Sequence, residues 1–152
     1  YEDCGFDYGM SVDHIIFGYD KRFDTDGKFD DNFKVSQTMQ KRYDITISNA
    51  KEFLSECKKQ KVNFHPIGVI QAWSPNSMKK AARTLVSMGY DYIAIGGLVP
   101  LDVNTCEEII KVVREEIGFD IRIHLLGFAK AKQLERFVKY KITSFDSTSP
   151  MI

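Results

Sequence analysis

Two aspartates, Asp13 and Asp146, each follow a mainly apolar run and are the first candidates for chemistry in this sequence. Asp146 closes the run 141–145 and is followed directly by hydroxyl residues and a proline. A positioned carboxylate can attack an anomeric carbon as a nucleophile, and it can also accept hydrogen bonds from a ligand. The plainer alternatives are an Asx turn for Asp146, which precedes Ser147, and a local pairing of Asp13 with His14 or a lysine.

Gln71, Gly96 and Gly97 occupy similar positions after two other apolar runs. An amide at the end of the run 62–71 is costly to bury unless it is hydrogen-bonded, so Gln71 serves either a ligand or a polar network. The glycine pair either only permits a sharp turn or brings bare backbone amides close to a planar ligand. An amide and a carboxylate can read the edge of a purine while a second carboxylate attacks a sugar. If these residues converge, they favour glycosyl transfer through a carboxylate nucleophile.

The elements that must position these residues alternate between strands and helices. Ser74 before Pro75 predicts a helix start, and Thr105 with Glu108 predicts a capping box for the next helix. A strand–helix repeat of about 20–30 residues is the βα module, in which the carboxyl ends of parallel strands face one crevice. We therefore expect the strand-end residues to converge on one pocket. We predict strands at 8–12, 62–71, 92–98, 121–127 and 141–150, and helices at 33–61, 74–88, 105–117 and 130–140.

Five strands fit either a doubly wound sheet or part of a (β/α)8 barrel. A nucleotide-binding sheet is disfavoured because Gly96 and Gly97 lack the third glycine of G-x-G-x-x-G. A complete barrel needs about 250 residues, so a chain of 152 would hold about five-eighths of one. We predict the α/β class and a (β/α)8 TIM barrel, with residues 1–152 as its C-terminal five strand–helix units and a fragment of a longer protein. The strand at 8–12 should then be an unpaired edge, which favours association such as a homodimer.

The amino-acid composition limits which partners and which cellular compartment are expected for this protein. Lys and Arg together number 21, as do Asp and Glu, so no net field draws the whole chain toward nucleic acid or an anionic membrane. No apolar run approaches the ~20 residues that cross a bilayer, so no membrane partner is expected. Three widely spaced cysteines favour a reducing compartment and hence a cytoplasmic protein.

The histidines predict no metal site. His14, His65 and His124 are scattered along the chain and form no zinc-binding pattern. His124 lies within an apolar strand, where we interpret it as a hydrogen-bonded core histidine.

Five short motifs occur in an order, and with spacings, similar to the strand-end motifs of the tRNA-guanine transglycosylases, the queuine and archaeosine insertion enzymes. Each motif alone is weak, but five in the same order are fairly specific. The resemblance covers most of the chain and implies the C-terminal five strands of that family's barrel. The motifs lie at residues 5–13, 68–71, 95–98, 124–127 and 145–147.

The resemblance implies a role for each strand-end residue. Asp146 matches the family's catalytic nucleophile, which holds the ribose C1′ after guanine leaves. Asp13, the second carboxylate of the catalytic centre, matches the group that recognises the heterocycle, and Gln71 matches its partner amide. The residues that match the base-contacting turn and the wall beneath the base are Gly96, Gly97, Leu98, Leu126 and Gly127.

By this resemblance the chain is part of a pentosyltransferase that exchanges guanine in tRNA or DNA for a 7-deazaguanine, as in queuosine formation, through a covalent aspartyl–nucleoside intermediate. No cofactor is implied within this chain. The family's zinc would be bound by a C-terminal segment that this sequence lacks, as it lacks the family's Asp-Ser-Gly-Gly turn. Trp73 and the runs 96–101 and 145–150 are closer to the related group that modifies DNA, and tRNA remains open. The rival interpretations are a phosphate-binding barrel aldolase or isomerase and a non-catalytic barrel relative.

Overall fold

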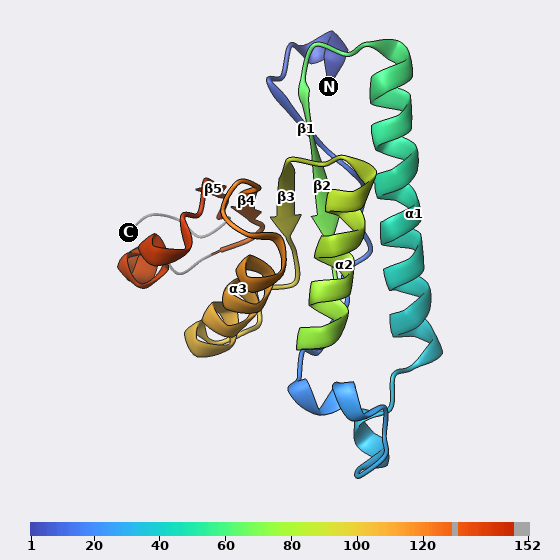
Figure 1. Ribbon diagram of the computed structural model, residues 1–152, viewed down its shortest axis with the longest axis vertical. Coiled ribbons are helices and arrows are strands. Elements are labelled where there is room, and N and C mark those ends of the chain that lie inside the picture. Colours follow the sequence, from blue (N-terminus) through green and yellow to red (C-terminus); the bar gives the residue numbers. More distant parts are fainter. Residues whose placement is uncertain (129–130, 148–152) are drawn as a thin grey trace.

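The computed structural model describes residues 1–128 and 131–147, and the strands within them form one parallel sheet (Figure 1). Their order in the sheet follows their order in the chain, and every neighbouring pair is parallel. The sheet curls into a half-barrel, so the predicted α/β class and partial barrel are confirmed. The strands are Tyr8–Met10 (β1), His65–Ile70 (β2), Tyr92–Ile95 (β3), Arg122–Leu125 (β4) and Ser144–Phe145 (β5).

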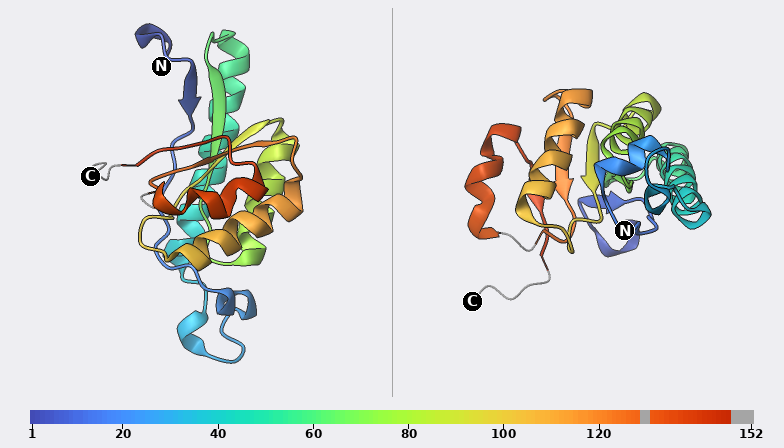
Figure 2. Two further views of the ribbon diagram at one scale, coloured as in Figure 1. Left: turned by 90° about the vertical axis from the view of Figure 1, so that its left-hand side faces the viewer. Right: turned by 90° about the horizontal axis from the view of Figure 1, so that it is seen from below.

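A helix connects each strand to the next along the outer side of the curl (Figure 2). Helices that follow one another in the chain also contact one another in space, so they form a continuous outer layer. None of the helices in the described part of the chain is long and apolar enough to cross a membrane. The connections are Gln37–Gln60 (α1), Pro75–Met88 (α2), Val103–Ile117 (α3) and the 3-10 helix Ala131–Tyr140 (η4).

Of the two predicted helix starts, one is correct and one is wrong. Ser74 caps α2, because its hydroxyl accepts a hydrogen bond from the N–H of Ser77, as predicted. The capping box at Thr105 is wrong. Asp102 caps α3 instead, since its carboxylate accepts from the N–H groups of Asn104 and Thr105 at 2.8 and 3.1 Å. A carboxylate three residues earlier therefore starts the helix before Thr105 can.

The two faces of the sheet carry separate apolar clusters. Alternate residues of a strand point to opposite faces, and β3 shows this clearly. Ile93 and Ile95 pack against the helices, whereas Tyr92 and Ala94 pack with Ile67 on the opposite face. The strands that carry the candidate residues at their ends are thus packed on both faces. The helix-facing core includes Ile70, Ala81, Leu85, Ile109, Ile110, Val113, Ile123, Leu125 and Phe137.

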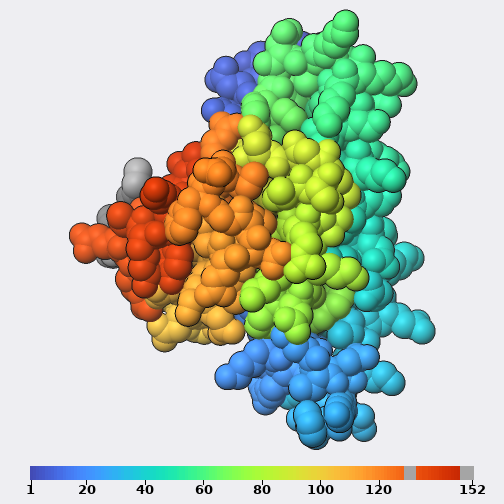
Figure 3. Space-filling view, viewed as in Figure 1, coloured from blue at the N-terminus to red at the C-terminus, as the bar shows by residue number. Residues whose placement is uncertain are grey.

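All five strands are shorter than predicted, and the last one differs most from its predicted range. Among the described strands β1 pairs only with β2, which confirms the predicted edge strand. The chain then leaves the sheet, and the segment around the 3-10 helices Lys21–Thr25 (η2) and Asp31–Phe33 (η3) projects beyond the carboxyl ends of the strands (Figures 1 and 3). A further 3-10 turn, Glu2–Cys4 (η1), precedes β1. Residues 148–150 of the predicted final strand lie outside the described residues.

Buried Arg114 of α3 ties the last strands to the helical layer. Only 4% of this residue is exposed, and its guanidinium donates to four backbone carbonyl groups at 2.5–2.9 Å. Burial lowers the pKa of this guanidinium below its usual value. Because the acceptors precede β4 and β5, this one side chain helps to place both strands. The carbonyl groups belong to Gly118, Ile121, Tyr140 and Lys141.

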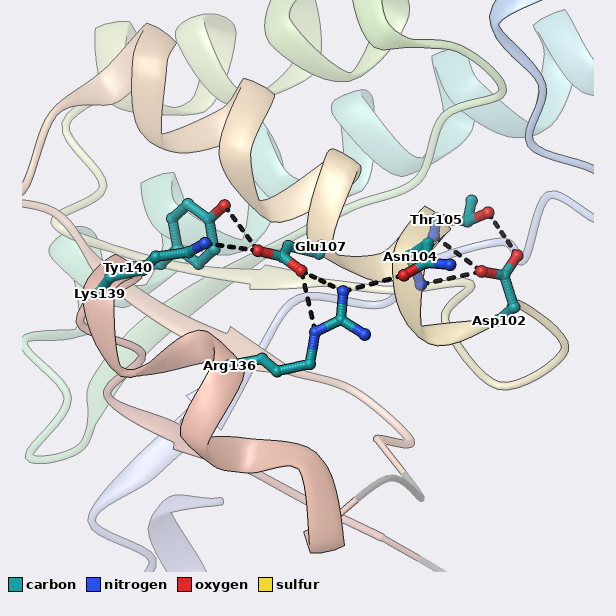
Figure 4. A network of polar contacts seen from close by, with 7 residues as sticks. All are labelled: Asp102, Asn104, Thr105, Glu107, Arg136, Lys139 and Tyr140. Carbon is teal, nitrogen blue, oxygen red and sulfur yellow. Dashed lines mark hydrogen bonds and ion pairs between the residues drawn. The ribbon is translucent and has the colours of Figure 1, made fainter.

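Glu107 of α3 binds η4 through its carboxylate (Figure 4). Its oxygens accept from Lys139 at 2.7 Å and from Arg136 at 2.6 Å, and the hydroxyl of Tyr140 donates at 3.2 Å. The hydrogen bond from Lys139, followed by that from Arg136, lowers the pKa of Glu107 to about 2. The network therefore fixes η4, and with it the approach to β5.

We expect Glu107→Gln to lower the melting temperature at pH 7, since the amide loses the charge that holds both cations. The folded-state pKa of Glu107 is depressed, so its contribution is present above about 4.5 and is lost as the pH falls toward about 2. The gap between wild type and variant should close over that range, as measured by thermal unfolding. Glu115→Gln, on the exposed side of α3 with cations at 3.8 and 3.9 Å, is the matched control. A gap that widens on acidification would contradict this role.

Candidate active site

Asp13 and Gln71 meet at the carboxyl ends of β1 and β2. Gln71 is only 2% exposed, and its Nε2 donates to Asp13 Oδ2 at 2.7 Å. Its Oε1 accepts from the backbone N–H of Ile16 at 3.3 Å. These two contacts decide which end of the amide faces the carboxylate, because a carboxylate can only accept. After accepting this hydrogen bond, the carboxylate of Asp13 keeps lone pairs for other donors, and the amide of Gln71 keeps a second N–H.

The turn after β3 lies directly against this pair. A Cβ atom added at Gly96 would overlap Gln71 Nε2 and lie 3.5 Å from Asp13 Oδ2. Gly97 has φ +78°, which favours glycine, and a Cβ there would lie 3.0 Å from Gln71 Oε1. Gly97 thus makes the sharp turn, and Gly96 permits the close approach of the Gln71 amide, whereas an approach of the glycine amides to a planar ligand stays a prediction.

The same turn reaches the neighbouring strand end. Val99 lies so close to Gly127 that an added Cβ would be 2.6 Å from its Cγ2, and Gly127 has φ +64°. The N–H of Gly127 donates to Oδ1 of Asp146. A continuous row of contacts therefore runs from Asp13 through the glycine turn to Asp146. These contacts link the ends of neighbouring strands, and the convergence of the residues on one pocket stays a prediction.

Asp146 follows β5 directly and has a firmly held backbone. Its N–H donates to Leu125 at 3.1 Å, and its carbonyl accepts from Phe128 at 2.7 Å. The side chain is 55% exposed. A carboxylate on a fixed backbone that also faces solvent is suited to nucleophilic attack on an incoming sugar.

His124 was interpreted as a hydrogen-bonded core residue, and this is only half correct. The residue is 7% exposed, and its Nδ1 lies 2.6 Å from the hydroxyl oxygen of Ser144. Its Nε2 is inaccessible to solvent and has no hydrogen-bond partner among the described residues. That atom lies 3.6 Å from Oδ2 of Asp146, which is too long for a hydrogen bond. A histidine two residues before the Leu126-Gly127 turn was the available signal, and sequence reasoning missed it.

Burial lowers the pKa of His124 below its usual value, and the nearby charge of Asp146 opposes this effect. Burial is the larger cause, so the imidazole is neutral near pH 7. A neutral imidazole carries its proton on one nitrogen only. The position of this proton decides whether the carboxylate of Asp146 faces an N–H donor or a lone pair on Nε2.

The two leucines predicted at the site take different places. Leu98 is fully buried in the helix-facing core, and its carbonyl accepts from Cys106 Sγ at 3.8 Å. Its side chain therefore does not line the site. Leu126 is partly buried and packs against the cluster on the opposite face of the sheet. Within the described ranges, no group of three or more His, Cys, Asp or Glu residues could hold a metal ion.

Comparison with known proteins finds similarity along the whole chain. The chain is 36% identical over 151 residues to a DNA-guanine transglycosylase from Salmonella montevideo. The aligned region covers 99% of this chain and 35% of that protein. The chain is 26% identical over 118 residues to a queuine tRNA-ribosyltransferase from Chlamydia felis (strain Fe/C-56), covering 68% of this chain and 32% of that protein. The chain thus spans about a third of the length of the curated relatives it matches. No protein-family model matches it.

Proposed function

The chain belongs to the tRNA-guanine transglycosylase family, and from this premise we propose that the protein carrying it replaces guanine in DNA by a 7-deazaguanine base. The observation that carries the proposal is the joined row of strand-end residues from Asp13 and Gln71 to Asp146. Such a row offers one carboxylate for a base and another for the sugar. The enzyme class that follows is a glycosyltransferase acting on nucleic acid.

In the first step, a carboxylate oxygen of Asp146 attacks C1′ of the target nucleotide. The bond from C1′ to guanine breaks, guanine leaves with the electron pair and takes up a proton, and a sugar–aspartate ester remains. In the second step the incoming base loses its ring N–H proton and its nitrogen attacks C1′, which releases the carboxylate of Asp146. Two inversions give net retention of configuration.

Asp13 and Gln71 would read the base. Guanine presents adjacent N–H donors beside a carbonyl oxygen on its pairing edge, and 7-deazaguanines keep this edge. Asp13 can accept from the donors while the second N–H of Gln71 donates to the carbonyl. The buried amide, oriented by Ile16, supplies this pattern without rearrangement.

DNA is the preferred polymer because the similarity to the DNA-guanine transglycosylase is higher and covers more of the chain than that to the queuine tRNA-ribosyltransferase. The alternative substrate is tRNA. Labelled guanine offered with duplex DNA and with tRNA in parallel distinguishes them. Incorporation into DNA supports the proposal, incorporation only into tRNA replaces the polymer, and incorporation into neither contradicts the function.

We expect Asp13→Asn to weaken binding of the free base by roughly 10- to 100-fold, because a mismatched buried polar group costs about 1–3 kcal/mol. The amide keeps the shape but presents a donor where the carboxylate only accepts. Capture of DNA by Asp146 should be less affected than base affinity. Asp44→Asn, an exposed carboxylate on α1, serves as control. Unchanged base affinity in Asp13→Asn, measured by calorimetry, would assign recognition to another residue.

The remaining partners are proposals of the same kind. The described residues do not fit zinc, and we derive no step through a metal or redox cofactor. The edge at β1 keeps a homodimer of the isolated chain as a prediction, which light scattering can test. A cytoplasmic location accords with a substrate found there and with reduced cysteines.

A further inference from the structure

The strand register brings three polar side chains together beside Asp146. His124 of β4 pairs with Ala94 of β3 on one side and with Ser144 of β5 on the other. The hydroxyl oxygen of Ser144 lies 2.6 Å from His124 Nδ1 and 2.5 Å from the hydroxyl oxygen of Tyr92. A chain of short contacts thus runs from Tyr92 through Ser144 to the imidazole, whose far nitrogen faces Asp146 Oδ2 at 3.6 Å.

The order of donors and acceptors from Tyr92 to His124, together with the charge of Asp146, selects one tautomer of His124. If Tyr92 donates to Ser144 and Ser144 donates to Nδ1, then Nδ1 is an acceptor and the imidazole proton is on Nε2. The reverse order would put a bare Nε2 lone pair against the negative carboxylate of Asp146. Electrostatics disfavours that arrangement, because the Nε2 atom is itself inaccessible to solvent and no water there can separate its lone pair from the charge. The Nε2–H group therefore points at Asp146.

We propose that His124 is a positioning residue for Asp146: its Nε2–H holds Oδ2 while the N–H of Gly127 holds Oδ1, so that the carboxylate is presented to C1′ in one orientation. This rests on the proposed role of Asp146 as nucleophile. Catalytic hydrogen bonds are often long without substrate and tighten in the complex, so 3.6 Å is a distance that bound nucleic acid would shorten. No other solvent-inaccessible polar nitrogen of a side chain in the described ranges is left without a partner.

The two donors also act on the second step. When the incoming base attacks C1′, negative charge returns to the Asp146 carboxylate as the ester bond breaks. Donors aimed at both oxygens stabilise that charge as it develops, which makes the aspartate a better leaving group. His124 thereby acts in both displacements without touching the sugar or the base.

The test compares His124→Phe with His124→Gln in the full-length protein. The phenyl ring fills the space without a donor, whereas the glutamine amide can place an N–H near the position of Nε2. We expect kcat for base exchange to fall by about 10- to 100-fold in His124→Phe, with KM for the base changed by less than roughly threefold, and to recover largely in His124→Gln. Equal losses in both variants, or no loss in His124→Phe, would overturn the proposal. Should His124→Phe fail to fold, His124→Asn, which is too short to reach the carboxylate, takes its place.

Two further measurements complete the test. Nitrogen-15 NMR of labelled histidine, assigned with His124→Gln, should show the proton on Nε2, and a proton on Nδ1 would overturn the proposal. Asp146→Asn is assayed in parallel. If that variant still forms the covalent adduct, the nucleophile is another residue, and the proposed role of Asp146 has failed together with that of His124. If it does not, while His124→Phe is fully active, only the role of His124 has failed.

Discussion

Asp146→Asn is expected to abolish covalent capture of nucleic acid and to reduce base exchange by roughly 10⁴-fold or more. The amide preserves the size of the side chain and can still accept from the N–H of Gly127. It lacks the negative charge and nucleophilicity that attack on C1′ requires. Exchange of labelled guanine gives the rate, and a denaturing gel shows the captured strand.

The matched control is Asp91→Asn at the opposite end of β3. Asp91 pairs with His65 at 2.6 Å and with Arg122 at 3.5 Å, at the amino ends of the strands. Its replacement removes a carboxylate from the same sheet without touching the site, so exchange should persist. A captured strand in Asp146→Asn would show that the nucleophile is another residue and that the β5 end is structural.

Gly96→Ala is expected to have the second largest effect, because the new methyl group would overlap the amide of Gln71. Either Gln71 turns away from Asp13 or the backbone of the turn shifts. Overpacking of this kind costs about 1–3 kcal/mol of stability. Losing the hydrogen bond between Gln71 and Asp13 should weaken base binding by roughly 10- to 100-fold. Thermal unfolding and calorimetry with a free 7-deazaguanine measure the two effects.

Two companion variants separate the steric cause from general damage. Gly118→Ala introduces a methyl group at φ +73° with no atom within 4 Å, so stability should fall while base affinity stays. Combining Gly96→Ala with Gln71→Ala removes the clash, so stability should partly return while base affinity does not. Wild-type base affinity in Gly96→Ala would show that the contact between Gln71 and Asp13 does not serve recognition.

The positions of Asp13, Gln71 and Gly96 could be predicted from the sequence because they depend on local patterns and one general rule. Each follows an apolar run, and parallel strands end at a common edge. The start of α2 at Ser74 was equally local, since a hydroxyl before a proline specifies it. Such features need no knowledge of which strand pairs with which.

The features that were missed depend on competition or on register. Asp102 and Thr105 are both good caps, and in the structure it is the Asp102 side chain that accepts from the N–H groups of the first turn. The strand β1 ends early because the hydroxyl of Ser11 accepts from the N–H of Val69 as the chain leaves the sheet. The partner of His124 follows from its pairing with Ser144, and register between distant strands is set by tertiary packing.

Peptide mapping of the captured adduct tests the central claim most directly. The full-length protein would be incubated with duplex DNA without free base, denatured, digested with nuclease and protease, and examined by mass spectrometry. The account predicts one sugar-bearing peptide, with the modification on Asp146. Modification of Asp13 or of any other residue, or efficient guanine exchange without a captured adduct, would contradict it.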